Sequence, residues 1–293
     1  MKPSKKWWLL LICAALAPAL ALPPAADADH RGEERVLYGM AHLSRTGPNL
    51  LYSIDPGTGE ATLVGSTGTS VLRISAMALS DDGVMYAVGV RNDAAETHVL
   101  VTIDLETAEP TEIGPTGLED FVGVFPQRRV MSDLSFSKDG ELYAYAFPGG
   151  GLATIDLATG TATQRIEPGF PGTGFFNGGG LAFSRLGVLL HGGDSGDQPG
   201  EGSAALQVLD PDDSEVLFER PLHFPDGFGL DPRPNTMDFH ARTGRLYSLF
   251  KANFMEQETY FGRIFPVLGI AWVIGPTADG MAALAWGPDP DDD

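Results

Sequence analysis

Residues 51–55 read LYSID, and this short phrase recurs three more times along the chain. The later copies are LVTID at 100–104, LATID at 152–156 and LQVLD at 206–210. They begin 49, 52 and 54 residues after one another, and three are followed by a turn of the DxxTG type or a close relative. A repeat with a period of about 50 residues indicates an architecture built from one supersecondary unit.

The same neighbours surround each copy in the same order. In the second unit an apolar segment at 77–80 precedes a DDG turn at 81–83, and MYAV follows at 85–88. The repeated phrase is then the third strand, and PTEIG at 110–114 is the fourth. Short strands with β-branched residues and regular Gly punctuation are typical of all-β repeat proteins. Four strands in each unit predict the blades of a propeller.

The two ends of the chain predict how the ring closes. The pattern begins in mid-blade, because VLYGM at 36–40 corresponds to a second strand. It ends on LAWG at 284–287, which corresponds to a first strand with only a tail after it. Pairing these two segments leaves no open sheet edge. We therefore predict one all-β domain over residues 36–288, a five-bladed β-propeller with four-stranded blades that is closed by the C-terminal strand.

The aspartates that end the repeated phrase are predicted to be turn residues. An Asp before a TG-type turn accepts hydrogen bonds from backbone N–H groups and fixes the turn. Copies in four separate blades lie far apart, so they do not form a carboxylate cluster. These residues are Asp55, Asp104, Asp156 and Asp210.

The first 28 residues predict a secretory signal peptide. Lys2, Lys5 and Lys6 precede an apolar stretch over 7–21, and small-x-small cleavage motifs follow at 19–21 and 26–28. Residues 29–35 are expected to be a linker and 289–293 an acidic tail. We therefore expect a periplasmic or extracellular protein with no membrane span after cleavage. Cys13 is the one cysteine of the chain, so no disulfide stabilises the mature domain.

The net charge limits the class of partner. The chain carries a formal charge of −20 at pH 7. Such a surface repels nucleic-acid phosphates and anionic lipids. We therefore expect an unknown protein or small molecule as partner, and a monomeric chain.

Loop length indicates where a site lies. Connections from the first to the second strand, and from the third to the fourth, are short throughout. The longer connections all emerge on the opposite face of a propeller: 91–98, 118–132, 167–180, 192–205, 220–236 and 251–262. Long loops on a rigid scaffold are the usual place for binding residues.

Apolar and basic residues are concentrated in these loops. Arg91, Arg128, Arg129, Arg220 and Arg233 lie there, and so do nine of the sixteen Phe residues: Phe121, Phe125, Phe170, Phe175, Phe176, Phe224, Phe228, Phe254 and Phe261. Such a patch on an acidic protein indicates a recognition surface. The alternative is that these Phe side chains fold inward and hold their own loops in place.

The residues just before the innermost strands are predicted to ring the mouth of the central channel. They are Arg73, Ser75, Asp133, Asn177, Asn235 and Asp279. Together with Arg128, Arg129 and Arg233, we predict that Arg73, Asp133, Asn177 and Asn235 bind the ligand. The oxygens of Asp133, Asn177, Asn235 and Asp279 are also of the type that Ca²⁺ or Mg²⁺ prefers. Turn and capping roles are the other interpretation of these four residues.

Three stretches resemble repeats of known proteins: 51–68, 100–117 and LSFSKDGELYAY at 134–145. They are similar to the secreted bacterial β-propeller proteins described as WD-like or YVTN-like, many of which have no assigned activity. The resemblance covers nearly all of the mature chain and implies the propeller fold. It implies no function, because the matching residues are strand and turn positions and no catalytic motif is shared.

Two main classes of function stay open. The first is an exported, non-catalytic binding or interaction propeller that has no cofactor and uses its long-loop face. The second is a hydrolase, lactonase-like or glycosidase-like, that holds Ca²⁺ or Mg²⁺ at the channel mouth and activates a water molecule. A structural protein of the cell envelope is a third possibility.

Overall fold

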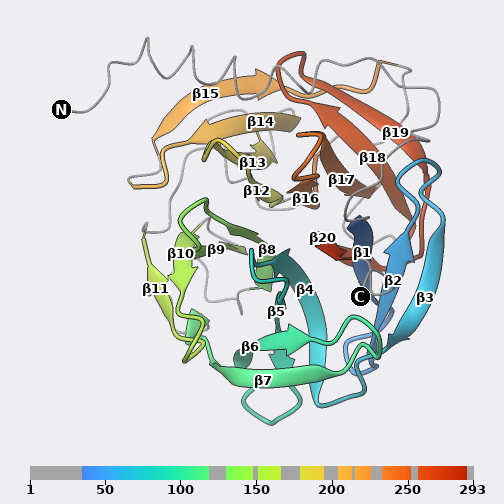
Figure 1. The fold of residues 1–293 in the computed structure, drawn as a ribbon, viewed down its shortest axis with the longest axis vertical. Coiled ribbons are helices and arrows are strands. Elements are labelled where there is room, and N and C mark those ends of the chain that lie inside the picture. The colour runs from blue at the N-terminus through green and yellow to red at the C-terminus, as the bar shows by residue number, and fades with distance from the viewer. Residues whose placement is uncertain are drawn as a thin grey trace.

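The computed structural model describes residues 35–118, 130–147, 151–165, 179–194, 204–212, 215–225, 233–251 and 257–288. These residues form five antiparallel sheets of four strands each. The sheets are arranged around a common axis, with one strand of each nearest the centre (Figure 1). The predicted five-bladed β-propeller is therefore confirmed.

Each blade is numbered from its innermost strand outward. Blade 1 contains β20 (Met281–Pro288), β1 (Arg35–His42), β2 (Asn49–Ile54) and β3 (Ala61–Ser66). Blade 2 contains β4 (Val71–Leu79), β5 (Met85–Arg91), β6 (His98–Ile103) and β7 (Pro110–Pro115). Blade 3 contains β8 (Val130–Phe136), β9 (Leu142–Phe147), β10 (Gly151–Ile155) and β11 (Ala162–Gln164). Blade 4 contains β12 (Leu181–Phe183), β13 (Leu189–Asp194), β14 (Ala204–Leu209) and β15 (Val216–Pro221). Blade 5 contains β16 (Thr236–Phe239), β17 (Leu246–Lys251), β18 (Thr259–Phe265) and β19 (Ile270–Pro276).

The C-terminal strand closes the ring as predicted. β20 pairs antiparallel with β1, with Leu37 opposite Trp286 and Gly39 opposite Leu284. A side chain at Gly39 would collide with Met281 and Ile54, so the close fit of this seam requires glycine there. The two chain ends thus share one sheet, and blade 1 has no unpaired inner edge.

The turn role of the repeated aspartates is also confirmed. Oδ1 of Asp104 accepts hydrogen bonds from the backbone N of Glu106 (3.0 Å) and Thr107 (2.8 Å), and Asp156 repeats the pattern with Ala158 and Thr159. Asp55 and Asp210 hold their turns in the same way. Hydrogen bonds from the backbone and hydroxyl of Thr107 lower the pKa of Asp104, and bonds from the hydroxyl and backbone of Thr159 lower the pKa of Asp156.

A second repeated feature packs neighbouring blades together. The glycine near the end of an outer strand lies against the TG turn of the next blade. A Cβ atom at Gly114 would lie under 3.0 Å from the carbonyl oxygen of Thr159. Gly65 meets the carbonyl of Thr107 in the same way, and Gly275 meets that of Thr58. This close approach explains why the fourth strand of three blades ends in glycine.

One predicted loop is partly wrong. The expected connection 251–262 contains the first residues of β18, which begins at Thr259 because its partner β17 extends to Lys251. Phe261 is therefore a fully buried strand residue that stacks on Tyr247 with ring centroids 5.5 Å apart. Phe224 packs edge-on against Phe250 at 5.2 Å. The other seven Phe residues of the predicted patch lie outside the described residues.

We predict that Gly114→Ala destabilises the fold. The added methyl group must displace the backbone of the neighbouring turn, which costs ~1–3 kcal/mol. Chemical denaturation followed by circular dichroism measures the loss. Thr111→Ala, at an exposed position of the same strand, is the control and adds no atom against blade 3. Equal losses in the two variants would contradict the blade-packing role.

A buried carboxylate at the seam predicts a pH dependence. Oδ2 of Asp238 accepts the backbone N–H of Trp286 at 2.8 Å, and burial raises the pKa of Asp238 to about 7. A folded-state pKa above the unfolded value means that stability is greatest at low pH and is lost as the pH rises toward 7. From pH 5 to 8 this group should cost about 1–2 kcal/mol.

Asp238→Asn should remove this slope. Buried histidines act in the opposite direction, because the pKa of His191 is lowered by burial to about 4 and stability is then lost as the pH falls below its usual value. The measurement is therefore the difference in unfolding free energy between the parent and Asp238→Asn at each pH. A difference that does not change with pH would show that Asp238 is ionised in the folded protein throughout.

Candidate binding site at the channel mouth

The mouth of the channel lies where the inner strands begin. On this face the chain also passes from second to third strands and from fourth strands to the next blade. The connections 67–70 and 277–280, which lead into β4 and β20, are short, whereas those that lead into β8, β12 and β16 are long. The sector where blades 5, 1 and 2 meet is therefore built almost entirely from described residues.

Asp133 is the most buried charged group of the inner ring. It lies on β8, and its side chain has no solvent exposure. Its Oδ2 accepts the backbone N–H of Leu181 at 2.8 Å and that of Met237 at 2.9 Å. Its Oδ1 accepts the Thr236 hydroxyl at 2.8 Å and the backbone N–H of Leu134 at 3.1 Å. One carboxylate thus joins the inner strands of blades 3, 4 and 5.

The electrostatics of Asp133 reflect two opposed effects. Burial raises the pKa of Asp133 well above its usual value, and the hydrogen bonds from Leu181, Met237, Thr236 and Leu134 act against this rise. Both carboxylate oxygens are occupied by donors of the protein itself. A cation bound here would have to displace some of these donors.

The other predicted cation ligands are placed less centrally. Nδ2 of Asn235 lies 3.5 Å from the carbonyl oxygen of Ala282, and Asp279 is exposed on the turn before β20. Asn177 lies outside the described residues, as do Arg128 and Arg129. Among the residues that the structure describes, no three His, Cys, Asp or Glu side chains are grouped to hold a metal ion. The cation site stays a prediction.

Arg73 occupies an unusual backbone position at the mouth. The pairing of β4 with β5 shifts between Leu72 and Ala76, so that β4 bulges there. Arg73 has φ of 50°, in the left-handed region that residues other than glycine seldom adopt. β-Bulges often re-aim a side chain beside a functional site, and such strained positions are enriched there.

The bulge is held in place from blade 1. Asn49 is fully buried, and its Oδ1 accepts the backbone N–H of Ile74 at 2.8 Å. Its Nδ2 donates to the carbonyl of Val71 at 2.9 Å, so one amide grips both sides of Arg73. Opposite the bulge, a side chain at Gly89 would collide with Val71 and Ile74. The conformation of Arg73 is thus determined by two blades.

The Arg73 side chain is partly exposed and paired. About a fifth of it is accessible (21%), and its guanidinium lies 3.4 Å from a carboxylate oxygen of Glu96. Glu96 comes from the 92–97 connection of blade 2, and it too has a positive φ, of 51°. Both members of the ion pair therefore project from left-handed backbone positions.

Two further basic residues lie beside Arg73. His42 ends β1, and its backbone N donates to the carbonyl of Gly280 at 3.1 Å. Burial, followed by the charges of Lys251 and Arg73, lowers the pKa of His42 to about 4. Lys251 ends β17, and burial lowers its pKa as well. These two residues were missed from the sequence, since each is simply the last residue of a second strand.

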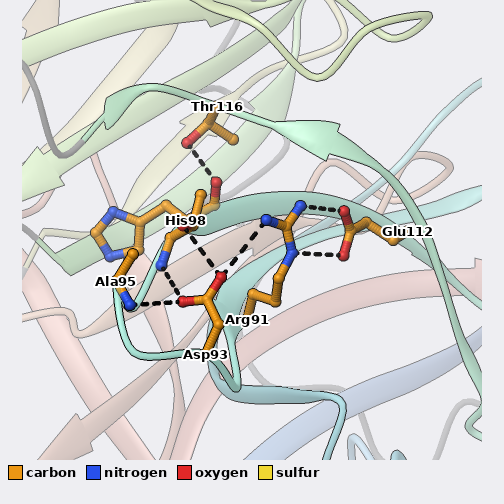
Figure 2. Close-up of polar contacts among 7 residues, drawn as sticks. Arg91, Asp93, Ala95, His98, Glu112 and Thr116 are labelled. Carbon is orange, nitrogen blue, oxygen red and sulfur yellow. Dashed lines mark hydrogen bonds and ion pairs between the residues drawn. The ribbon is translucent and has the colours of Figure 1, made fainter.

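The neighbouring Arg91 is neutralised by its own blade. Its guanidinium makes two hydrogen bonds to the carboxylate of Glu112 and lies 3.5 Å from Asp93 (Figure 2). Asp93 also accepts the backbone N–H of Ala95 at 3.0 Å and so orders the 92–97 connection. Arg91 was expected in the recognition surface, but here it serves to hold this loop.

The remaining basic residue of the predicted ligand set is Arg233. It is half-buried just before β16, two residues from Asn235. It lies on the same face as Arg73, on the other side of the blade 5–blade 1 seam.

Comparison with known proteins supports the fold and no more. No protein-family model matches the chain, and no curated protein sequence matches it. Among solved structures, a chain of a nidogen/laminin complex covers 87% of this chain and 98% of its own, with a TM-score of 0.52 and 11% identity. The β-xylosidase RS223 covers 69% of this chain and 77% of its own, with a TM-score of 0.52 and 13% identity.

A third similar structure is a protein of unknown function from Bacteroides caccae, which covers 87% of this chain and 99% of its own at a TM-score of 0.47 and 11% identity. Identities this low show the shared fold alone. The expected resemblance to bacterial propellers is supported at that level. Export and the WD-like character of the repeats stay predictions.

We predict that Asn49→Ala destabilises the domain by about 1–3 kcal/mol, because it removes the hydrogen bonds of Ile74 N and Val71 O in a buried site. Thermal and chemical unfolding measure the loss. The control is Asn92→Ala, since Asn92 is exposed and donates to one carbonyl, that of Thr69. A loss no larger than that of the control would contradict the role of Asn49 in holding the bulge.

Proposed function

We propose that this chain is an exported, monomeric β-propeller that binds a small ligand or a protein through its long-loop face, with no catalytic role. The main support is the bulge at Arg73. A non-glycine residue in the left-handed region costs of order 1–3 kcal/mol, and such strain persists where surrounding structure enforces it. Here Asn49 and Gly89 enforce it, and the outcome is a basic side chain presented at the channel mouth.

The exposed aromatic surface contributes less than its sequence promised. Phe261 and Phe224 both pack into the domain. The proposal therefore rests on the polar groups of the mouth, with Arg73 and Arg233 on its rim and Asn235 between them and the axis.

The alternative function is a hydrolase that uses a divalent cation at the channel mouth. It would require Asp133 to give up hydrogen bonds to Leu181, Met237 or Thr236, and Asn177 and Asp279 to approach it. Carboxylate and amide oxygens are suitable ligands, so a cation response would favour this function.

A thermal-shift screen tests the binding function. A ligand that binds only the folded state raises the melting temperature, by ~2.7 kcal/mol of stability at a hundredfold excess over Kd. The panel contains neutral sugars, divalent cations, small carboxylates and phosphates. We expect at least one compound to stabilise the parent protein and to lose that effect in Arg73→Gln.

The control is Arg242→Gln, at an exposed position on the turn between β16 and β17, on the opposite face. A ligand whose effect survives Arg73→Gln and disappears in Arg242→Gln would contradict the proposed face. Stabilisation by calcium or magnesium alone, with hydrolysis of a lactone or glycoside substrate, would favour the hydrolase.

A further inference from the structure

The basic residues at the seam of blades 5, 1 and 2 form a group that is unusual for this chain. The protein has a formal charge of −20, yet His42, Arg73 and Lys251 are close enough that the charges of the last two depress the pKa of the first. Like charges that gather against the overall charge of a protein cost energy unless a counter-charge is present.

Printed contacts link the three residues through one stretch of chain. Lys251 pairs with Thr259 across β17 and β18, and the Thr259 hydroxyl donates to the carbonyl of Gln257 at 3.1 Å. The same carbonyl accepts the backbone N–H of Gly280 at 2.7 Å, and the carbonyl of Gly280 accepts that of His42. His42 in turn lies against Ile74, the residue after Arg73.

Lys251 has no counter-charge among the residues that the structure describes. Its side chain makes no ion pair or hydrogen bond within that part of the chain, although it is only partly exposed. Leu249, two residues earlier on β17, packs with Leu37 and Met281 of blade 1, so Lys251 lies on the face of blade 5 that meets blade 1. A lysine desolvated in this way is stabilised by a bound anion.

His42 also has an unused polar atom. Its Nδ1 is buried and has no hydrogen-bond partner within the described part of the chain. A buried polar atom without a partner is uncommon and marks a place where a ligand or water completes the structure. A nearby anion would favour the protonated imidazole, which donates from both nitrogens.

Arg73 is held near this group by its ion pair with Glu96. The pair has a separation of 3.4 Å and is partly exposed, with 38% of the Glu96 side chain accessible. Exposed pairs of this kind contribute about 0–1 kcal/mol, so a better-placed anion can displace Glu96. Arg91, by contrast, is held by the carboxylates of Glu112 and Asp93.

We propose that Arg73, Lys251 and His42 form a binding site for the oxyanion group of a small ligand, a carboxylate or a phosphate. The inference rests on the proposed function, since it names the ligand chemistry of the same face. Arg73 supplies a planar donor pair suited to two oxyanion oxygens, and Lys251 supplies a second positive charge. Glu96 occupies the Arg73 guanidinium when no ligand is bound.

The test measures affinity for inorganic phosphate and for succinate by thermal shift, with sodium chloride at matched ionic strength as the reference. We expect one or both anions to stabilise the parent protein. Arg73→Gln and Lys251→Gln should each weaken binding by roughly tenfold, because each removes one charge-assisted contact. Arg91→Gln is the matched control on the same face and should leave the affinity unchanged.

A gain of affinity is the sharper expectation. Glu96→Gln removes the carboxylate that competes for Arg73, so it should strengthen anion binding several-fold. A purely structural ion pair would not produce this gain. Melting temperatures in chloride alone show whether each variant is folded, and Arg73→Lys, which keeps the charge, serves if Arg73→Gln is not.

The outcomes separate the two proposals. Phosphate without succinate, or the reverse, supports the oxyanion site and identifies the group that it prefers. If neither anion binds but a neutral sugar does so in an Arg73-dependent manner, the oxyanion site is wrong and the binding function stands. If the anions bind equally well to the parent, Arg73→Gln and Lys251→Gln, the site is likewise wrong.

Discussion

The carboxylate of Asp133 joins three blades at the centre of the ring. It accepts hydrogen bonds from Leu181 of blade 4 and from Met237 and Thr236 of blade 5, while its own strand belongs to blade 3. This part of the ring has the shortest strands, since β11 and β12 contain three residues each. A buried carboxylate with all its hydrogen bonds made compensates for the ladder hydrogen bonds that these short strands lack.

The same device recurs around the axis. Ser135 accepts the backbone N–H of Phe183, and Asp238 accepts that of Trp286; each acceptor is 48 residues before its donor, as Asp133 is before Leu181. An inner-strand side chain therefore reaches the next blade at a fixed offset. The repeated unit carries, besides its strands and turns, a polar contact that joins one blade to the next.

These inner contacts determine where a ligand can bind. Because the oxygens of Asp133 are engaged near the axis, the basic groups with capacity for a ligand lie further out, at the seam of blades 5, 1 and 2. There the connections 67–70 and 277–280 are short, and Asn49 fixes the bulge that carries Arg73. Rigidity at the axis and strain at the rim thus belong to one arrangement.

The sequence predicted the blades, the turns and the ring closure, since each depends on local residues such as Asp104 or on patterns repeated every blade. It also identified Arg73 and Asp133 as residues of the mouth. It could not assign their roles, because the partners of Asp133 are 48 and 104 residues away and the bulge at Arg73 depends on Asn49. Lys251 and His42 have no local signal, since their proximity arises from ring closure alone.

The unfolding free energy of Asp133→Asn, with and without millimolar calcium, tests this account most directly. An amide at this position presents a donor to the N–H groups of Leu181 and Met237, so we expect a loss of about 3 kcal/mol that calcium does not alter in the parent or the variant. Asp279→Asn, at an exposed position, should change nothing. A variant as stable as the parent, with a calcium stabilisation that the substitution abolishes, would contradict the account and make Asp133 a cation ligand.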